Sequence, residues 1–330
     1  MARYLISRLL VYVGVIFVGI SICFIIPRFT PLDPVMTLIY RFSQYGQYYD
    51  PEAVGRMIES LKELYGLKGS IWDQYITFWR RLFSFDLGPS LTYFPISVVE
   101  IINRALPWTL SLLITTTILG WLIGNLLGGI AGYFSNKRWA KVLEIIATTI
   151  YPIPYYILSL ILIILLTYLF PLFPAFGTPS ISPSLSIEFI TSYIYHSFLP
   201  ALSLILINYG WWFISMRSLI TRIINEDYVV FARAAGIPDR RIMWRYVIRN
   251  SLLPQVTGLS MSLAGIFNGA LITEMVFSYP GIGWVLFNAI TNGDFNLMMG
   301  ILVYSIVAVA SAALLLDLIY PLIDPRIRYR

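Results

Sequence analysis

The residues best suited to bind a partner lie in one charged segment, residues 226–254, which interrupts the otherwise apolar C-terminal two-thirds of the chain. Between Ala232 and Gly236 every side chain except that of Arg233 is small. A short helix with this composition can bring its backbone close to the groove of a partner protein. The chemistry that this segment predicts is therefore docking by shape and charge.

A second helix is expected after Ile237, because Pro238 suits a first helical turn and Asp239 suits the cap before it or that turn itself. Helical spacing places Trp244, Val247 and Ile248 on one apolar face of this helix. It places Arg241, Arg245 and Arg249 on a separate basic face. A basic amphipathic helix binds anionic lipid as readily as a protein, so the pattern alone leaves both interpretations open.

Other polar residues interrupt the apolar stretches singly. Asn268 and Glu274 are candidates for a translocation pathway or gate, together with the turn Tyr279-Pro280-Gly281 that follows. A structural hydrogen bond that holds this turn is the equally weighted alternative for Glu274. Pro152 and Pro154 remove two amide donors and predict a kink, whose freed carbonyls either border the pathway or only accommodate neighbouring helices.

Motifs for catalysis are absent from the sequence. It has no G-x-x-x-x-G-K-[ST] to hold ATP phosphates, no H-E-x-x-H, no G-x-S-x-G and no intramembrane carboxylate pair. His196 is the only histidine and is expected to be an interfacial hydrogen-bonding residue, and Cys23 is the only cysteine. We therefore expect no catalytic, cofactor-binding or metal-binding residues, and any ATP-derived energy must come from another subunit.

The composition is that of a polytopic membrane protein. Of the 330 residues 58% are hydrophobic and 12% charged, against about a quarter charged in soluble domains. Six stretches approach the roughly 20 apolar residues that a spanning helix needs. They are residues 9–26, 108–131, 143–166, 198–214, 256–276 and 297–319.

Charge distribution predicts the orientation of these spans. With the N-terminus in the cytoplasm, most of the 23 Lys and Arg residues fall in interior segments, including residues 217–249 and the C-terminal tail. Both ends are then cytoplasmic, and so is the segment 226–254. This asymmetry accounts for the net charge of +6, so nucleic acid is not an expected partner.

The chain divides into three parts by composition. Residues 1–26 form an anchor helix, residues 27–106 a small exterior α-helical domain, and residues 107–330 a core of five spans with a cytoplasmic loop, 217–254. In the exterior part, Asp50-Pro51-Glu52 opens a helix that ends at Gly66, and a second helix covers residues 72–83. This domain is either a solvated lid or a surface that contacts an external protein or the pathway.

Four glycines recur at steps of four in the second span: Gly120, Gly124, Gly128 and Gly132. On a helix they form one smooth stripe. Since packing drives helix association in lipid, the stripe predicts a closely packed helix partner.

The motif E-D-Y-V-x-x-A-R-A-x-G, followed by a basic run and L-L-P, resembles the coupling loop of ABC importer permeases of the dipeptide, oligopeptide and nickel branch. Val230 and Phe231 replace Glu and Ala of the wider consensus, and Ala235 replaces the Lys usual in this branch. Other matching runs cover nearly the whole chain: Asp33-Pro34-Val35, Asp86-Leu87-Gly88, E-x-x-F-S-x-P-G-x-G from Glu274, and Asp324-Pro325-Arg326.

This resemblance implies a non-catalytic permease in the plasma or inner membrane, complexed with a second related permease. Two cytoplasmic ATPase subunits would bind ATP and Mg, and an external protein would deliver substrate. The helix at residues 228–237 would couple ATP-driven closure to movement of the spans. The contact residues so implied are Glu226, Asp227, Tyr228, Ala232, Arg233, Ala234, Ala235, Gly236, Ile237, Arg240 and Arg241.

The substrate is open at this stage. Short peptides come first by resemblance, then oligosaccharides and nickel. The alternative from another class is a membrane scaffold or energy-independent channel whose basic loop binds only lipid.

Overall fold

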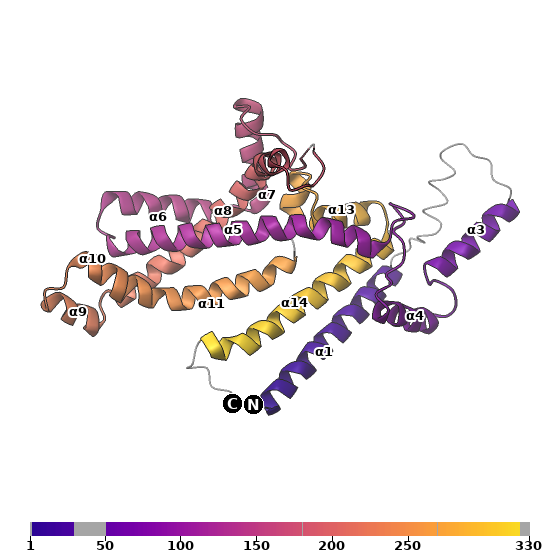
Figure 1. Cartoon of the computed structure of the whole chain (residues 1–330), viewed down its shortest axis with the longest axis horizontal. Coiled ribbons are helices and arrows are strands. Elements are labelled where there is room, and N and C mark those ends of the chain that lie inside the picture. Colours follow the sequence, from indigo (N-terminus) through magenta and orange to yellow (C-terminus); the bar gives the residue numbers. More distant parts are fainter. Residues whose placement is uncertain (1, 30–50, 180, 269, 324–330) are drawn as a thin grey trace. The chain divides into compact units, whose positions relative to one another are not determined.

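The computed structural model describes residues 2–29, 51–179, 181–268 and 270–323 (Figure 1). These residues form helices and their connections, with one isolated β-bridge between Pro89 and Ser97. The expected all-helical, polytopic membrane fold is confirmed. The sequence features at Asp33-Pro34-Val35, at Asp50 and in the arginine-rich tail after residue 323 lie outside the described residues.

Four of the described helices contain stretches long and apolar enough to cross a membrane. The stretches are Ile6–Ile25, Val98–Tyr133, Ile187–Ile223 and Phe295–Leu318, and they belong to α1 (Ala2–Ile25), α5 (Val98–Tyr133), α8 (Ile187–Ile223) and α14 (Phe295–Ile323). The count becomes five if one bent pair of helices is a single span. The total of six stays a prediction.

The expected third span breaks at its two prolines. Helix α6 (Arg138–Ile150) is followed by α7 (Tyr155–Ile163) and the π-helical turn η2 (Ile164–Leu169), and the two parts are bent by 105°. Pro154 is the N-cap of α7 and cannot donate a backbone hydrogen bond. The expected kink is therefore a full break in the helix.

The expected fifth span, residues 256–276, is not one helix. It is divided among α11 (Arg249–Gly265), the 3-10 turn η4 (Ile266–Asn268) and α12 (Leu271–Val276). Gly265 and Asn268 are weak helix formers, which accounts for the interruption. The prediction of one continuous spanning helix at residues 256–276 is therefore wrong.

The helices form two compact units, one of residues 1–108 with 281–330 and one of residues 109–280. In the first unit α1 and α14 are antiparallel, since Arg8 pairs with Asp317 at 3.1 Å and Tyr12 hydrogen-bonds Ser311 at 3.0 Å. The start of α1 and the end of α14 therefore lie on the same side. This pairing joins segments that composition had assigned to separate parts of the chain.

A second core in the first unit joins the start of α5 to α13 (Ile282–Thr291) and α14. Its buried residues are Val98, Ile101, Ile102, Ala105, Ile282, Ala289, Leu297 and Ile301. Asp294 caps α14 by accepting from the Leu297 amide at 3.0 Å, and it also accepts from the Ser90 hydroxyl and the Thr92 amide. One buried carboxylate thereby ties the segment before α5 to the start of α14.

In the second unit α8 packs against the glycine stripe of α5. A Cβ atom added at Gly120, Gly124 or Gly132 would lie 2.7, 2.5 or 2.9 Å from the Cβ of Asn208, Trp212 or Ile220. The partners advance with the glycines along the chain, so the two helices are parallel. Their backbones approach this closely because glycine has no side chain.

Helices α3 (Pro51–Leu64) and α4 (Ile71–Phe83) agree with the two helices predicted in the exterior part. Gly66 follows α3 in a left-handed conformation with φ of 67°. Helix α4 starts with a capping box between Ser70 and Asp73. Its aromatic residues contact α1, through Tyr75 and Phe78 on Phe24 and through Trp79 on Phe17.

Candidate functional site

The charged segment folds into α9 (Asp227–Ala234), the single turn α10 (Asp239–Arg241) and the π-helical η3 (Ile242–Ile248), which continues into α11. Glu226 is the extended N-cap residue of α9, and Asp227 in the first turn places a negative charge where the helix dipole favours it. The small-residue stretch thus forms a helix, as predicted, but one that ends before Gly236.

Gly236 ends α9 in a Schellman motif. Its φ is +72°, its amide donates to the Arg233 carbonyl at 3.0 Å, and the Ile237 amide donates to the Ala232 carbonyl at 3.2 Å. Ile237 then packs against the apolar core beneath the helix. No atom lies within 4 Å of the position of a Gly236 Cβ, so glycine is required here by backbone conformation and not by space.

One face of α9 is buried within the chain. Val229 and Ala232 belong to an apolar core with residues of α8 and η3, namely Met216, Ile220, Ile242, Met243, Val247 and Ile248. Ala232 is therefore not on the surface, although its small side chain had suggested contact with a partner. Its size instead allows α9 to lie close to the chain's own core.

The opposite face of α9 is exposed. Phe231, at 73%, is its most exposed large apolar side chain, with Tyr228 and Val230 beside it. Other predicted contact residues in and around α9 are also exposed: Glu226, Asp227, Arg233, Ala234, Ala235, Gly236, Arg240 and Arg241. An apolar helix face bordered by charged residues is suited to protein docking.

Tyr133, at the end of α5, connects α5 with α9 and α10. Its hydroxyl donates to the Asp239 carboxylate at 3.2 Å and hydrogen-bonds the side chain of Arg233. Tyr228 on α9 is in turn linked to α11, because the Asn250 side-chain amide donates to its hydroxyl at 3.3 Å. Movement of α9 would consequently pull on α5, on α8 through the shared core, and on α11.

The basic face of the second helix is exposed as predicted, at Arg241, Arg245 and Arg249. Trp244, however, is exposed, whereas Ile242, Met243, Val247 and Ile248 are buried. The predicted apolar face was wrong at this residue because η3 is π-helical, with more residues per turn than the 3.6 on which the prediction relied.

A buried polar cluster in the second unit is formed by residues of α5, α8, α12 and the turn after α12. Thr109 donates to Glu274 at 2.8 Å, and neither side chain is appreciably exposed. Tyr279 donates to the Tyr193 hydroxyl at 3.3 Å, which donates to Ser111 at 2.8 Å. Burial raises the pKa of the Tyr279 phenol, so the phenol remains a neutral donor.

The turn after α12 is bound to a second loop. Gly177 donates its amide to the Phe277 carbonyl at 2.7 Å, and Thr178 donates to the Ser278 carbonyl at 2.7 Å. The Tyr279 amide donates to the Glu274 carbonyl at 2.8 Å, so Glu274 also holds this turn through its backbone. Pro280 follows, and Gly281 is the N-cap of α13. The Asn268 side chain lies outside the described residues.

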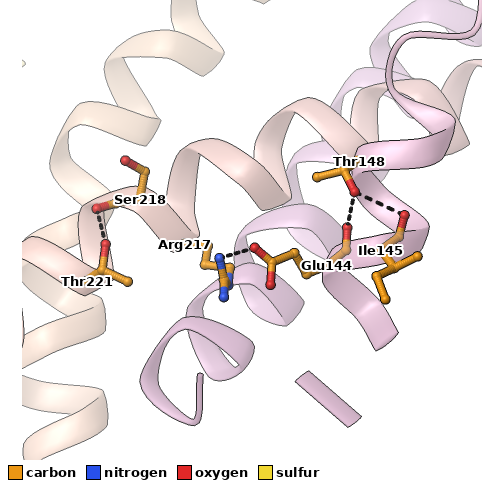
Figure 2. Close-up of polar contacts among 6 residues, drawn as sticks. All are labelled: Glu144, Ile145, Thr148, Arg217, Ser218 and Thr221. Carbon is orange, nitrogen blue, oxygen red and sulfur yellow. Dashed lines mark hydrogen bonds and ion pairs between the residues drawn. The ribbon is translucent and has the colours of Figure 1, made fainter. Parts of the chain in front are cut away.

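Pro152 and Pro154 lie in the exposed break between α6 and α7. Just before it, α6 packs closely on α8, where a Gly210 Cβ would lie 2.9 Å from the Tyr151 Cβ. Earlier in α6, the Glu144 carboxylate accepts a hydrogen bond from Arg217 on α8 (Figure 2), while the buried Nε atom of Arg217 has no hydrogen-bond partner. The break therefore adjoins a helix pair that is fixed by packing and charge.

Residues 124–329 match the family model described as "Binding-protein-dependent transport system inner membrane component". The chain belongs to this family. It is thus an inner membrane component with several membrane-crossing helices, and both the α9 segment and the turn after α12 lie within the matched residues.

This inner membrane component has relatives that align over nearly its whole length. It is 29% identical to the oligopeptide transport system permease protein AppB of Bacillus subtilis, with 100% of both chains covered. It is 24% identical to the dipeptide transport system permease protein DppB of Lactococcus lactis, with 99% of this chain and 100% of the relative covered. It is 26% identical to the oligopeptide transport system permease protein OppB of Escherichia coli, with 100% of both covered.

Four polar residues of the sites were not singled out from the sequence. Thr109, Ser111 and Tyr193 are ordinary members of apolar helices, and nothing local shows that they meet Glu274 and Tyr279. Glu144 had a signal, since a carboxylate inside a predicted span requires a partner.

Proposed function

We propose that the chain is the permease subunit of an ATP-driven importer of short peptides, and that α9 is its contact with an ATPase subunit. The exposed apolar face of α9, backed by its own core, is the observation that carries this proposal. The family membership supports a transport role, and the names of the full-length relatives support peptides ahead of oligosaccharides or nickel.

The proposed complex contains this chain, a second related permease, two ATPase subunits with ATP and Mg, and an external substrate-binding protein. The two permeases each form half of the pathway. The chain itself catalyses no reaction. Both ends of the chain are cytoplasmic in this proposal, which agrees with the antiparallel α1 and α14 and with the distribution of Lys and Arg.

In the proposed mechanism ATP closes the ATPase pair and the groove that holds α9 moves. The core of Val229, Ala232 and their neighbours transmits this movement to α8, while Tyr133 transmits it to α5. The spans then change from inward-open to outward-open. ATP can drive this change only if it binds the two states with different affinity.

Charge substitutions on two faces of the segment test the docking role. Phe231→Asp places a charge on the exposed apolar face, and Arg245→Glu reverses a charge on the basic face of η3. We expect Phe231→Asp to release the ATPase subunit during co-purification and to abolish substrate-stimulated ATP hydrolysis, with Arg245→Glu retaining both. Loss of the ATPase subunit with Arg245→Glu alone would instead place the contact on the basic face of η3. Failure of any ATPase subunit to co-purify with the unsubstituted chain would favour the lipid-binding scaffold.

The substrate is tested separately. The external binding protein that stimulates ATP hydrolysis by the reconstituted complex should bind short peptides, as measured by calorimetry. A binding protein that takes only oligosaccharides or nickel would contradict the peptide assignment while leaving the importer proposal intact.

A further inference from the structure

Helix α4 leaves a stripe of large apolar side chains uncovered. Trp72 is 73% exposed, Ile76 55% and Phe83 77%. At 100° per residue these three positions fall within a narrow arc of one helix face. No residue of α4 is fully buried in the protein, although eight of its thirteen residues are apolar or aromatic. The residues that the structure describes therefore do not cover this face.

The adjoining face of α4 lies against the part of α1 that is long and apolar enough to cross a membrane. Phe17 stacks on Trp79 with ring centroids 5.5 Å apart, Ser21 shares a 2.7 Å hydrogen bond with Tyr75, and Phe24 contacts Tyr75 and Phe78. All three α1 residues belong to the apolar stretch Ile6–Ile25. Both helices belong to the same compact unit.

The depth of these contacts follows from helix geometry. A stretch of 20 residues is about 30 Å long, the thickness of the hydrocarbon layer. Phe17 is eight residues before Ile25, so it lies about 12 Å inside the end of the span. A helix in contact with Phe17, Ser21 and Phe24 must lie at the level of one leaflet, not above the membrane.

We propose that α4 is an interfacial helix embedded in the lipid leaflet at the C-terminal end of α1, with Trp72, Ile76 and Phe83 facing lipid. On α1, Val18, Ile22 and Ile25 are exposed large apolar residues as well. Gln74 contacts Arg28, which lies three residues after the end of the span at Ile25, so the start of α4 lies at the membrane surface. Trp72, in this first turn, is at the level where tryptophan is enriched.

The charges on α4 fit the same position. Arg80 is exposed beside the apolar stripe, and its long side chain can direct its guanidinium toward the membrane surface while its stem lies along lipid. Asp73 is exposed in the first turn, at the surface end of the helix. Helix α4 would then act as a lipid anchor for the segment between α1 and α5, which was predicted from the sequence to be wholly exterior.

A fluorescent label distinguishes lipid from water at this face. In the full-length chain, with Cys23→Ala, single cysteines at Ile76→Cys, Leu10→Cys and Glu59→Cys would carry an environment-sensitive fluorophore. Leu10 is an exposed residue of the α1 span, and Glu59 is an exposed residue of α3. The labelled proteins would be placed in vesicles of phosphatidylethanolamine and phosphatidylglycerol, with or without lipid that carries a nitroxide near the start of its acyl chains.

We expect the fluorescence of the label at position 76 to match that of the label at position 10. Its emission should shift to shorter wavelength, the lipid nitroxide should quench it, and aqueous iodide should quench it several-fold less than at position 59. Phe83→Cys provides a second position on the stripe should the first variant not insert. Iodide quenching at 76 and 83 equal to that at 59, or no quenching by lipid nitroxide, would overturn the proposal and favour a solvated lid or a face covered by protein.

Discussion

Gly128 on α5 faces the backbone of Phe213 on α8 so closely that a Cβ atom at this glycine would lie 2.5 Å from the Phe213 carbonyl oxygen and 2.9 Å from its Cα. Backbone cannot move aside as the end of a flexible side chain can. The contact between the two parallel helices therefore depends on the absence of one methyl group.

Gly128→Ala should destabilise the protein by about 1–3 kcal/mol, because the added methyl group overpacks the α5–α8 contact. Gly14→Ala is the matched control, since Gly14 also lies in a spanning helix but has no atom within 4 Å of its Cβ position. Thermal unfolding in detergent measures both. Equal melting temperatures for the two variants would contradict this packing role.

Gly236→Val should lower the stability of the α9 segment by about 1–2 kcal/mol, because a residue with a Cβ atom is strained in the left-handed conformation. Gly236→Asn should cost less, since asparagine tolerates this conformation. Hydrogen exchange at the backbone amides of residues 236 and 237 measures the loss of the Schellman hydrogen bonds in each variant. Equal exchange rates in the two variants would show that the backbone conformation is not what requires glycine.

Thr109→Val should destabilise the protein by about 1–3 kcal/mol, because it removes a hydrogen bond to the buried Glu274 carboxylate. In combination with Glu274→Gln the loss should be less than the sum of the single losses, as measured by a double-mutant cycle of unfolding free energies. Thr191→Val is the control, since Thr191 is exposed and bonds only carbonyls of its own helix. Strict additivity would show that this contact contributes no coupling energy.

The start of α4 should depend on pH. The pKa of the Asp73 carboxyl is held below its usual value mainly by a hydrogen bond from the Ser70 hydroxyl, and to a smaller extent by one from the Ser70 amide. Because the folded-state pKa is lowered, the capping box stabilises α4 above the unfolded-state pKa of about 4, and this contribution is lost as pH falls through the folded-state value. The protection factors of the first α4 amides, which are exchange rates relative to the intrinsic rate at the same pH, should fall in that range, and Asp73→Asn should remove this pH dependence. A fall of equal size in Asp73→Asn would assign it to another group.

Local sequence patterns predicted the features that depend on local chemistry. The breaks at Pro152 and Pro154 follow from two missing amide donors, and α3 and α4 follow from their caps and apolar periodicity. The glycine stripe predicted a close helix contact because its spacing is set by one helix. The same periodicity argument failed at Trp244, where a π-helical turn changed the spacing of the faces.

Contacts between distant residues could not be read in this way. That Ala232 lies inward and Phe231 outward depends on the placement of α9 against α8 and η3, because both residues belong to the same short helix. In the cluster of Glu274, Thr109, Tyr279 and Tyr193, the hydrogen bond between Thr109 and Glu274 joins residues 165 positions apart.

The sequence alone determined that this chain is a multi-helix membrane protein with one long charged segment, because hydropathy, charge and helix caps act over a few turns of chain. The tertiary structure decided which face of α9 is available to a partner, which polar residues are buried together, and that α4 lies along α1. These features arise because separate helices bury one another's apolar surfaces. The free energy of this burial depends on two surfaces that come from different segments of the chain, so no single segment predicts it.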